Sequence, residues 1–492
     1  MKNYIYKTIL GLTGFALLIG CSDFLEEEVY TQYDPETFLQ DQGGVDALVT
    51  GVYAATATTG FGARDYYQIL NEFSTDMSFE SDGGLERFVL PIQEFNLDPS
   101  IPFIPNEYSK YYTAISRANG VLTVTDDVQD LDEGVTNTIR GEARFLRAFS
   151  YYILHNLFGP TPIIEIPADA SLDEIERIGK ETPRATEEEY RAYVEADLLF
   201  AAETLDAGGL SSRANKGSAY ALLTKFYLNN KEWQKAADAA NEVLGLGYEL
   251  FDDYPLMFTV NGENNNEYIF RTECVVGTGQ TNFYLAHSFP PEFVRQPNWG
   301  YFGAQYRVYT AFYETFEEND TRRTPFLVEY VNPNQPTDTI LYSRNAAGEA
   351  LDNVRSFKYA PDPNAQGVGH GNDIPILRLA DIILARAEAL NELNGPNQES
   401  IDLINQVRER ANASAIALTD YPSTESLRDF ILAERGRELY DEGLRREDMI
   451  RHGKFISNAI SRGLPAQPFH VLYPIPQDQI DNNPNLEQNP GY

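Results

Sequence analysis

Apolar residues recur at helical spacing in several separate blocks of the chain. In the first block, five positions share one face of a predicted helix: Val45, Leu48, Val49, Val52 and Tyr53. A second block covers 107–158 and stops at Gly159-Pro160, where glycine favours a helix end and proline prevents its continuation. The pattern therefore predicts that 45–58 and 107–158 form a helical hairpin.

Two further blocks also predict helical hairpins. Between 216 and 247, large residues on the first helix face alanines on the second, as small residues must where two helices approach closely. This arrangement resembles a tetratricopeptide repeat. Another hairpin is predicted over 376–411, with its turn at Asn394-Gly395-Pro396. Because the 34-residue spacing of such repeats is not sustained, these are a few repeats inside a larger domain.

Between the helical blocks the composition changes. Residues 59–106 are rich in Gly, Pro, Asp and Phe, and residues 248–375 carry short β-like runs separated by turn residues. The tail 464–492 is rich in Pro and Asn and predicts an extended strap over the surface. No Ser/Gly linker divides the chain. The sequence predicts a mainly α, single large domain, with tetratricopeptide-like hairpins as scaffold and long loop and short β-strand insertions.

The charge balance excludes several classes of partner. The chain has 38 Lys and Arg against 74 Asp and Glu, a formal net charge of −36. Such an excess argues against nucleic acid, whose phosphates need clustered cations, and against a basic patch on anionic lipid. A 42% hydrophobic fraction, with 12% aromatic residues, argues against a disordered chain.

The first residues predict an export signal. Lys2 and Lys7 precede an uncharged apolar run over 9–19, which is too short for a transmembrane helix and typical of a signal peptide over 1–20. Leu18-Ile19-Gly20-Cys21 resembles the bacterial lipobox, so Cys21 is predicted to carry lipid and 21–35 to form an acidic tether. The alternative is an ordinary secreted protein with a chance cysteine. Cys274 would then be a lone thiol, without an internal disulfide or a cysteine zinc site.

Short motifs are spread over nearly the whole length of the chain. They include Gly51-Val52-Tyr53, Leu377-Arg378-Leu379-Ala380-Asp381, Glu434-Arg435-Gly436-Arg437-Glu438-Leu439 and Gln488-Asn489-Pro490-Gly491-Tyr492. By these motifs the chain resembles the SusD/RagB outer-membrane lipoproteins of Bacteroidetes. Asp320-Thr321-Arg322-Arg323 departs from the family's more usual Asp-Pro-Arg-Arg. The resemblance implies a SusD-like domain over 36–492. Charged motif residues amid apolar stripes are expected to tie helices together by ion pairs: Arg378, Glu388, Arg435, Arg437 and Glu438.

The resemblance also implies a function. Family members sit on the cell surface as lids on SusC-like TonB-dependent transporters, and they capture oligosaccharides or, in some members, peptides for import. They are not enzymes and carry no catalytic cofactor. The expected location is the cell outer membrane, with lipid anchoring through Cys21. The expected partners are the transporter and a glycan; a RagB-like peptide-binding protein is the alternative.

The sequence lacks the common motifs of catalytic and metal-binding sites. The chain has no Gly-x-Ser-x-Gly elbow, no His-Glu-x-x-His and no phosphate-binding loop, and its five histidines lack metal-ligand spacing. No enzyme and no metal site are expected. A surface glycoside hydrolase stays a less favoured alternative, since 74 acids could include a carboxylate pair about 5–10 Å apart. A structural calcium ion is possible at Asp252-Asp253 or 261–267, although the alternating ligand pattern is absent.

Aromatic residues concentrate where a sugar could stack. Residues 281–316 hold twelve aromatics in 36 positions, and the segment 298–302 has the Gly and Asn typical of a loop. A second cluster lies in 59–106. The candidate ligand-binding residues are Asn298, Trp299, Tyr301, Phe302, Tyr67, Asp76, Phe79 and Arg87. The aromatic rings would stack on sugars, and the polar groups would bind hydroxyls. The net charge favours a neutral glycan, unless Arg64 and Arg87 form a local positive pocket.

Overall fold

The computed structural model describes residues 42–59, 62–127, 132–167, 170–208, 212–303 and 305–492. The predicted signal peptide, Cys21 and the tether over 21–35 lie outside these residues. One continuous hydrophobic core extends from Val45 to Leu486, which fits the single domain that the sequence predicts. No helix within the described ranges is both long and apolar enough to cross a bilayer.

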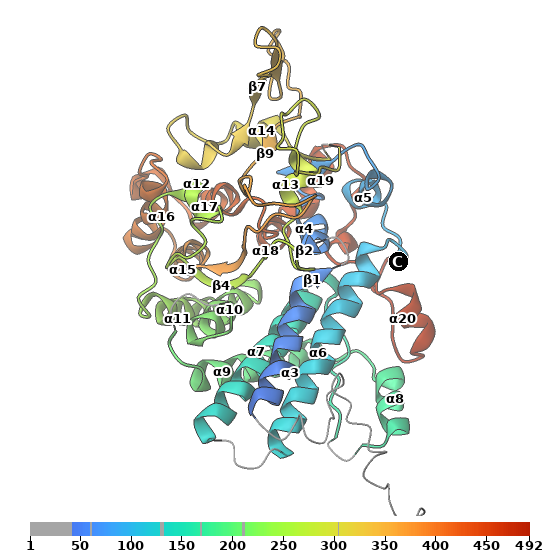
Figure 1. The fold of residues 1–492 in the computed structure, drawn as a ribbon. Helices are drawn as coiled ribbons and strands as arrows, with labels where there is room; N and C mark the ends of the chain where they lie inside the picture. Colours follow the sequence, from blue (N-terminus) through green and yellow to red (C-terminus); the bar gives the residue numbers. More distant parts are fainter. Residues whose placement is uncertain (1–41, 60–61, 128–131, 168–169, 209–211, 304) are drawn as a thin grey trace, which may run out of the picture.

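The protein is mainly α-helical (Figure 1). Its longer helices are α3 (Gln42–Ala57), α6 (Phe103–Asp127), α7 (Glu133–Phe158), α9 (Glu187–Thr204), α10 (Lys216–Asn229), α11 (Trp233–Leu244), α15 (Leu379–Asn394), α16 (Gln398–Arg410) and α17 (Thr424–Leu439). The shorter ones are α4 (Asp65–Glu72), α5 (Glu86–Gln93), α8 (Leu172–Glu181), α12 (Tyr254–Met257), α13 (Tyr284–Ser288), α14 (Thr310–Tyr313), α18 (Arg445–Arg451), α19 (Phe455–Ser461) and α20 (Gln477–Asn482).

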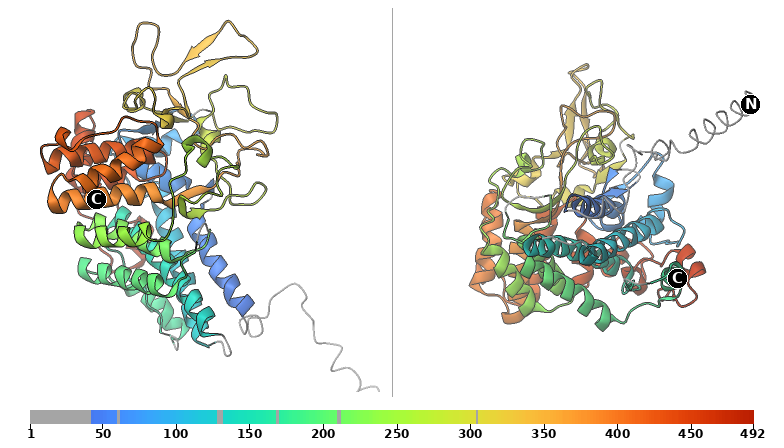
Figure 2. Two further views of the ribbon diagram at one scale, coloured as in Figure 1. Left: turned by 90° about the vertical axis from the view of Figure 1, so that its left-hand side faces the viewer. Right: turned by 60° about the horizontal axis from the view of Figure 1, so that its bottom comes forward.

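The long helices stack as antiparallel hairpins. Helices α3, α6 and α7 pack together, α7 packs on α9, and the stack continues through α10, α11, α15 and α16. Figure 2 shows these layers on one side of the molecule and the loops on the other. In the hairpin of α10 and α11, Ala236, Ala237 and Ala240 are buried at the contact, so the predicted close approach is confirmed. Helix α7 ends at Gly159, whose φ of 73° requires glycine, as predicted.

The strands are short and paired two by two. They are β1 (Thr58–Thr59), β2 (Gly62–Ala63), β3 (Ser78–Glu80), β4 (Tyr268–Thr272), β5 (Tyr306–Val308), β6 (Phe326–Leu327), β7 (Glu329–Val331), β8 (Thr339–Leu341), β9 (Arg355–Ser356) and β10 (Ile374–Arg378). The antiparallel pairs are β1–β2, β3–β5, β4–β10, β6–β9 and β7–β8. The sequence prediction was wrong at Ile376, which belongs to β10 rather than to the following helix. An apolar run this short does not distinguish a strand from a helix start.

The C-terminal tail lies across the end of α7. The amide N–H of Tyr473 donates to Leu157 O at 2.7 Å, and the Asn489 side chain donates to Phe158 O at 3.0 Å. The tail contains a 3-10 helix at Pro468–Val471 and the short helix α20 at Gln477–Asn482, and between them the chain has no regular secondary structure. Tyr473 and Asn489 therefore close the last turn of this scaffold helix, α7.

A network of buried ion pairs joins the helical scaffold to the strands. Arg378, at the end of β10, donates to Glu438 at 2.6 Å, to Glu267 at 2.8 Å and to Glu442 at 2.8 Å. Arg322 reaches the other oxygen of Glu438 at 3.1 Å. Burial alone would favour protonated acid, but the neighbouring arginines lower the pKa of Glu438 to about 2. Glu438 thus stays ionised with its charge shared among several guanidinium groups.

The other charged motif residues also pair, which confirms the expectation that they tie helices together. Arg435 on α17 binds Asp381 of α15 at 2.7 Å and Asp448 of α18 at 2.8 Å. Glu388 on α15 binds Arg451 of α18 at 2.6 Å. The remaining pair, Arg437 with Glu434, lies within α17 at 2.7 Å. Apart from Arg437, each of these charges has its partner on another segment, so these motifs are tied to the fold.

Removing Glu438 should destabilise the protein strongly. The variant Glu438→Ala leaves Arg322, Arg378 and Arg410 without a shared carboxylate, and breaking a buried pair costs about 3–5 kcal/mol. The urea midpoint measures this loss. As a control, Glu176→Ala breaks an exposed pair with Lys180 on α8 and should leave the urea midpoint nearly unchanged, because solvent screens such a pair. Equal effects of the two substitutions would contradict the role of the network.

Candidate ligand-binding surface

The turn over 298–302 is held by a second loop, far along the chain. Trp299 and Gly367 form a parallel bridge, in which Gly300 N donates to Gly367 O at 2.6 Å and Gly367 N donates to Asn298 O at 2.9 Å. A Cβ on Gly300 would come within 2.9 Å of the Gly367 carbonyl carbon, so glycine permits this approach. The backbone of the turn is therefore fixed before any ligand arrives.

Asn298 and Trp299 lie side by side in this turn. Asn298 is exposed, and its side-chain amide donates to Ala365 O at 2.5 Å, which leaves its carbonyl oxygen able to accept. Trp299 is half-buried and stacks on Phe289, with the ring centroids 5.8 Å apart and the planes at 15°. Its indole N–H is buried and has no hydrogen-bond partner among the described residues. The packing fixes the plane of the indole ring.

Tyr301 and Phe302 complete the turn in different ways. Tyr301 is 41% exposed, and the guanidinium of Arg295 lies 3.6 Å from the centre of its ring. Phe302 stacks on His287 at 4.3 Å, and His287 stacks in turn on Tyr306 at 4.4 Å. Tyr301 therefore faces solvent, whereas Phe302 is one layer of a packed aromatic column.

Two predicted residues of the first insertion, Asp76 and Phe79, lie just before β3 and within it, respectively. Strand β3 pairs with β5 and sets Phe79 opposite Arg307, and the Phe79 ring stacks on Tyr309 with centroids 4.6 Å apart. Asp76 forms a two-point ion pair with Arg445, at 2.8 and 2.9 Å. Burial opposes ionisation of Asp76, but Arg445 holds its pKa below the ordinary value. The carboxylate of Asp76 is thus already paired with Arg445 and is not free to bind a ligand hydroxyl.

Tyr67 and Arg87 lie apart from the turn. Tyr67 is 3% exposed and sits in the core, with the Arg64 guanidinium 4.3 Å from its ring. Arg87 is exposed on α5, over its neighbour Phe88. Because Arg64 is buried, these two arginines do not form the exposed positive pocket that would have favoured an acidic ligand. Tyr67 has no surface to offer a ligand.

Sequence reasoning missed the partners that shape the turn. The Gly-rich stretch 367–371 supplies Gly367, which holds the backbone of 298–300. His370 follows in this stretch and contacts the rings of Phe289 and Trp299 at 6.1 and 6.0 Å. The repeated glycines of 367–371 are typical of a place where two backbone segments lie close together. Nothing in the sequence said which segment would approach.

The oxygen-rich stretches considered for calcium serve structural roles. Asp253 caps α12 by accepting from Leu256 N at 3.0 Å, and Asn265 accepts from the N–H of Glu267 at 2.9 Å. Glu267 itself binds Arg378 and Arg410. Over the ranges that the structure describes, no group of three or more His, Cys, Asp or Glu side chains could hold a metal ion.

Two family models match the chain. One, described as starch-binding associating with outer membrane, matches residues 23–228, and the other, described as the SusD family, matches residues 294–492. The chain belongs to the SusD family. The matches lie on both sides of β4 and include most of the scaffold helices.

Individual SusD proteins match over comparable lengths. SusD-like protein P2 of Formosa agariphila is 27% identical over the whole of both chains, and starch-binding protein SusD of Bacteroides thetaiotaomicron is 27% identical over 75% of each. Among solved structures, a laminarin binding SusD-like protein is 25% identical, has a TM-score of 0.75, and covers 91% of this chain and 99% of its own. The SusD fold therefore extends along nearly all of this chain.

The histidine beneath Trp299 predicts a pH dependence of stability. Burial lowers the pKa of His370 to about 4, from an ordinary value near 6.5. The unfolded chain takes up this proton as pH falls below about 6.5 and the folded protein only near 4, so stability falls between these values by about 3 kcal/mol. His370→Asn should lose this part of the dependence, measured as melting temperature from pH 7 to pH 4. Parallel curves for the variant and the wild type would contradict the assignment.

Proposed function

We propose that this protein is a cell-surface, lipid-anchored glycan-binding protein that captures oligosaccharide and delivers it to a SusC-like TonB-dependent transporter. The observation that carries the proposal is the pre-formed turn over 298–302, which presents an exposed tyrosine beside an exposed asparagine. Its SusD relatives include a starch-binding protein and a laminarin binding protein. The family description of association with the outer membrane supports the location.

The chemistry of the turn suits a sugar. Aromatic rings offer an apolar face to the C–H groups of a pyranose, while neighbouring polar groups bind its hydroxyls. Tyr301 supplies an exposed ring, Trp299 a second ring of fixed orientation, and Asn298 an available carbonyl oxygen. Because the loop over 365–367 already orders this backbone, binding would require little further loss of conformational entropy. Phe79, stacked on Tyr309, would extend the platform.

The ligand is proposed to be a neutral glycan. The whole chain carries a net charge of −36, which repels polyanions at long range. Locally, Arg64 is buried and Asp76 neutralises Arg445, so neither offers a free positive site for an acidic sugar. Arg295 is stacked on Tyr301 and would contribute mainly to the orientation of that ring.

Replacing the two rings of the turn should abolish glycan binding. Affinity gel electrophoresis with laminarin, starch and a panel of other neutral polysaccharides would find a ligand for the mature chain. Trp299→Ala combined with Tyr301→Ala should then weaken its affinity by at least tenfold, since stacking surfaces of both rings are lost. Leu172→Ala, which changes a residue 83% exposed on α8, is the control and should bind like the wild type. Unchanged binding by the double variant would remove these rings from the site.

The same assays separate the alternatives. Binding of a peptide library, with no binding of any polysaccharide, would replace the glycan by a peptide ligand. Release of reducing ends from a bound polysaccharide would show a glycoside hydrolase and overturn the proposal of a binding protein. Hydrolysis is not expected from the turn itself, because residues 298–302 include aromatic rings and an amide but no carboxylate.

The transporter partnership predicts a stable complex. Native membranes solubilised in mild detergent should yield this protein together with a large outer-membrane barrel protein of the SusC type. Cys21→Ser should release the protein from the membrane fraction, since the thiol is the proposed site of lipid attachment. Purification of the wild-type protein alone under these conditions would count against the partnership.

A further inference from the structure

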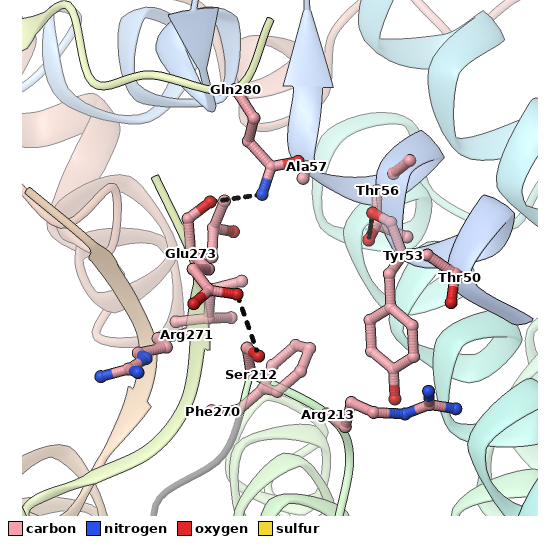
Figure 3. A pocket seen from close by; sticks show the side chains of 13 residues that line it. Thr50, Tyr53, Thr56, Ala57, Ser212, Arg213, Phe270, Arg271, Glu273 and Gln280 are labelled. Carbon is pink, nitrogen blue, oxygen red and sulfur yellow. Dashed lines mark hydrogen bonds between the residues drawn. The ribbon is translucent and has the colours of Figure 1, made fainter. Parts of the chain in front are cut away.

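A separate hollow lies where the helical scaffold meets the strands. It encloses about 300 Å³ between the C-terminal half of α3, the strand β4 and the segments around 212 and 280 (Figure 3). None of the residues of the 298–302 turn lines it. Its volume is at the lower end of the range for small-ligand pockets.

One wall of the hollow is apolar and rigid. It consists of the ring of Tyr53 with Ala54, and the Phe270 side chain, which is 2% exposed, packs beside the Tyr53 ring. The Tyr53 hydroxyl donates to Glu142 at 2.6 Å and accepts from Ala214 N at 2.7 Å, so the ring cannot swing away. The Phe270 ring lies 6.3 Å from it, at an interplanar angle of 51°. This wall could receive the C–H face of a pyranose without rearranging.

The opposite wall is polar. Figure 3 shows Gln280, Glu273 and Ser212 along this side, facing Tyr53. Ser212 lies 3.4 Å from the Glu273 carboxylate, and the Gln280 amide donates to the Glu273 carbonyl oxygen. The carboxylate of Glu273 and the amide oxygen of Gln280 retain capacity to accept hydrogen bonds. Such groups could accept from several hydroxyls at once.

The charges around the hollow favour a neutral ligand. Arg213 binds Glu142 at 2.9 Å, and Arg271 binds Asp373 at 2.9 Å and points away from the hollow in Figure 3. Their positive charges are therefore compensated. Glu273 is exposed and would repel an anionic group.

We propose that this hollow is a second sugar-binding site, which takes one or two rings of a neutral glycan. The choice of glycan as the ligand class rests on the proposed function, but the site is independent of the aromatic turn. An apolar wall opposite a row of hydrogen-bond acceptors matches the two kinds of surface that a pyranose carries. The small volume limits the ligand to a chain end or a short oligosaccharide.

Ligand-observed NMR on the mature chain tests this site. The probes are glucose, galactose, mannose, xylose, maltose and laminaribiose. The test protein carries Trp299→Ala and Tyr301→Ala, so that the turn cannot contribute. At least one probe should show saturation transfer to this double variant. Adding Ala54→Phe, which fills the hollow from an exposed position, should reduce that signal at least tenfold.

Ala47→Phe is the matched control. Ala47 is exposed on α3 two turns before Ala54, hence on the same helix face, but outside the hollow. It should leave the signal unchanged in the same background. Glu273→Gln combined with Gln280→Ala should also weaken the signal, without adding bulk to the helix.

The outcomes separate this site from the proposed function. If no probe binds the double variant, or if Ala54→Phe leaves the signal intact, the second site is overturned, while polysaccharide binding by the wild type would still support the turn. If the probes bind the hollow, but polysaccharide binding is unchanged by Trp299→Ala and Tyr301→Ala, the proposal for the aromatic turn is overturned and the proposal for the hollow is supported. Saturation transfer to the dipeptide glycyl-leucine alone, lost in Ala54→Phe, would overturn the sugar assignment.

Discussion

The buried charge network around Glu438 is the constraint on which the architecture depends. Arg378 reaches it from the end of β10, and Glu267 joins it from the residue before β4. These two strands are the stem from which the long insertion leaves the scaffold and to which it returns. A buried arginine is stable at this point only when all its carboxylate partners are within hydrogen-bond distance. This requirement fixes the position of α17 relative to β4 and β10.

Through this stem the scaffold also orders the candidate ligand-binding turn over 298–302. The segment between β4 and β10 carries both the 298–302 turn and the stretch 367–370 that holds it. Because both ends of this segment are fixed against α17, its two distant parts can meet through the Gly300–Gly367 contact. The aromatic rings then pack in layers, with Trp299 on Phe289. The insertion is long, yet its ligand-facing turn is ordered by the same scaffold that carries the family motifs.

Periodicity predicted the scaffold well because helices are determined by local contacts. The hairpin of α10 and α11 and the end of α7 at Gly159 followed from spacing and turn residues alone. Prediction of the site was less complete, because exposure depends on partners distant in sequence. Tyr67 is a residue type that often contacts ligands, but its ring is covered by Arg64. Asp76 forms an ion pair with Arg445, which is 369 residues away in the sequence. No local pattern contains that information.

The net charge of −36 is distributed unevenly between the interior and the surface of the protein. Several arginines are buried in ion pairs with buried carboxylates; Arg322, Arg378 and Arg435 are examples. Such pairs remove charges of both signs from the surface and leave the net charge of the chain unchanged. The accessible surface therefore carries nearly the whole negative excess with fewer cations to offset it. A net negative surface repels anions at long range, which supports the proposal of a neutral ligand for both the aromatic turn and the hollow beside Tyr53.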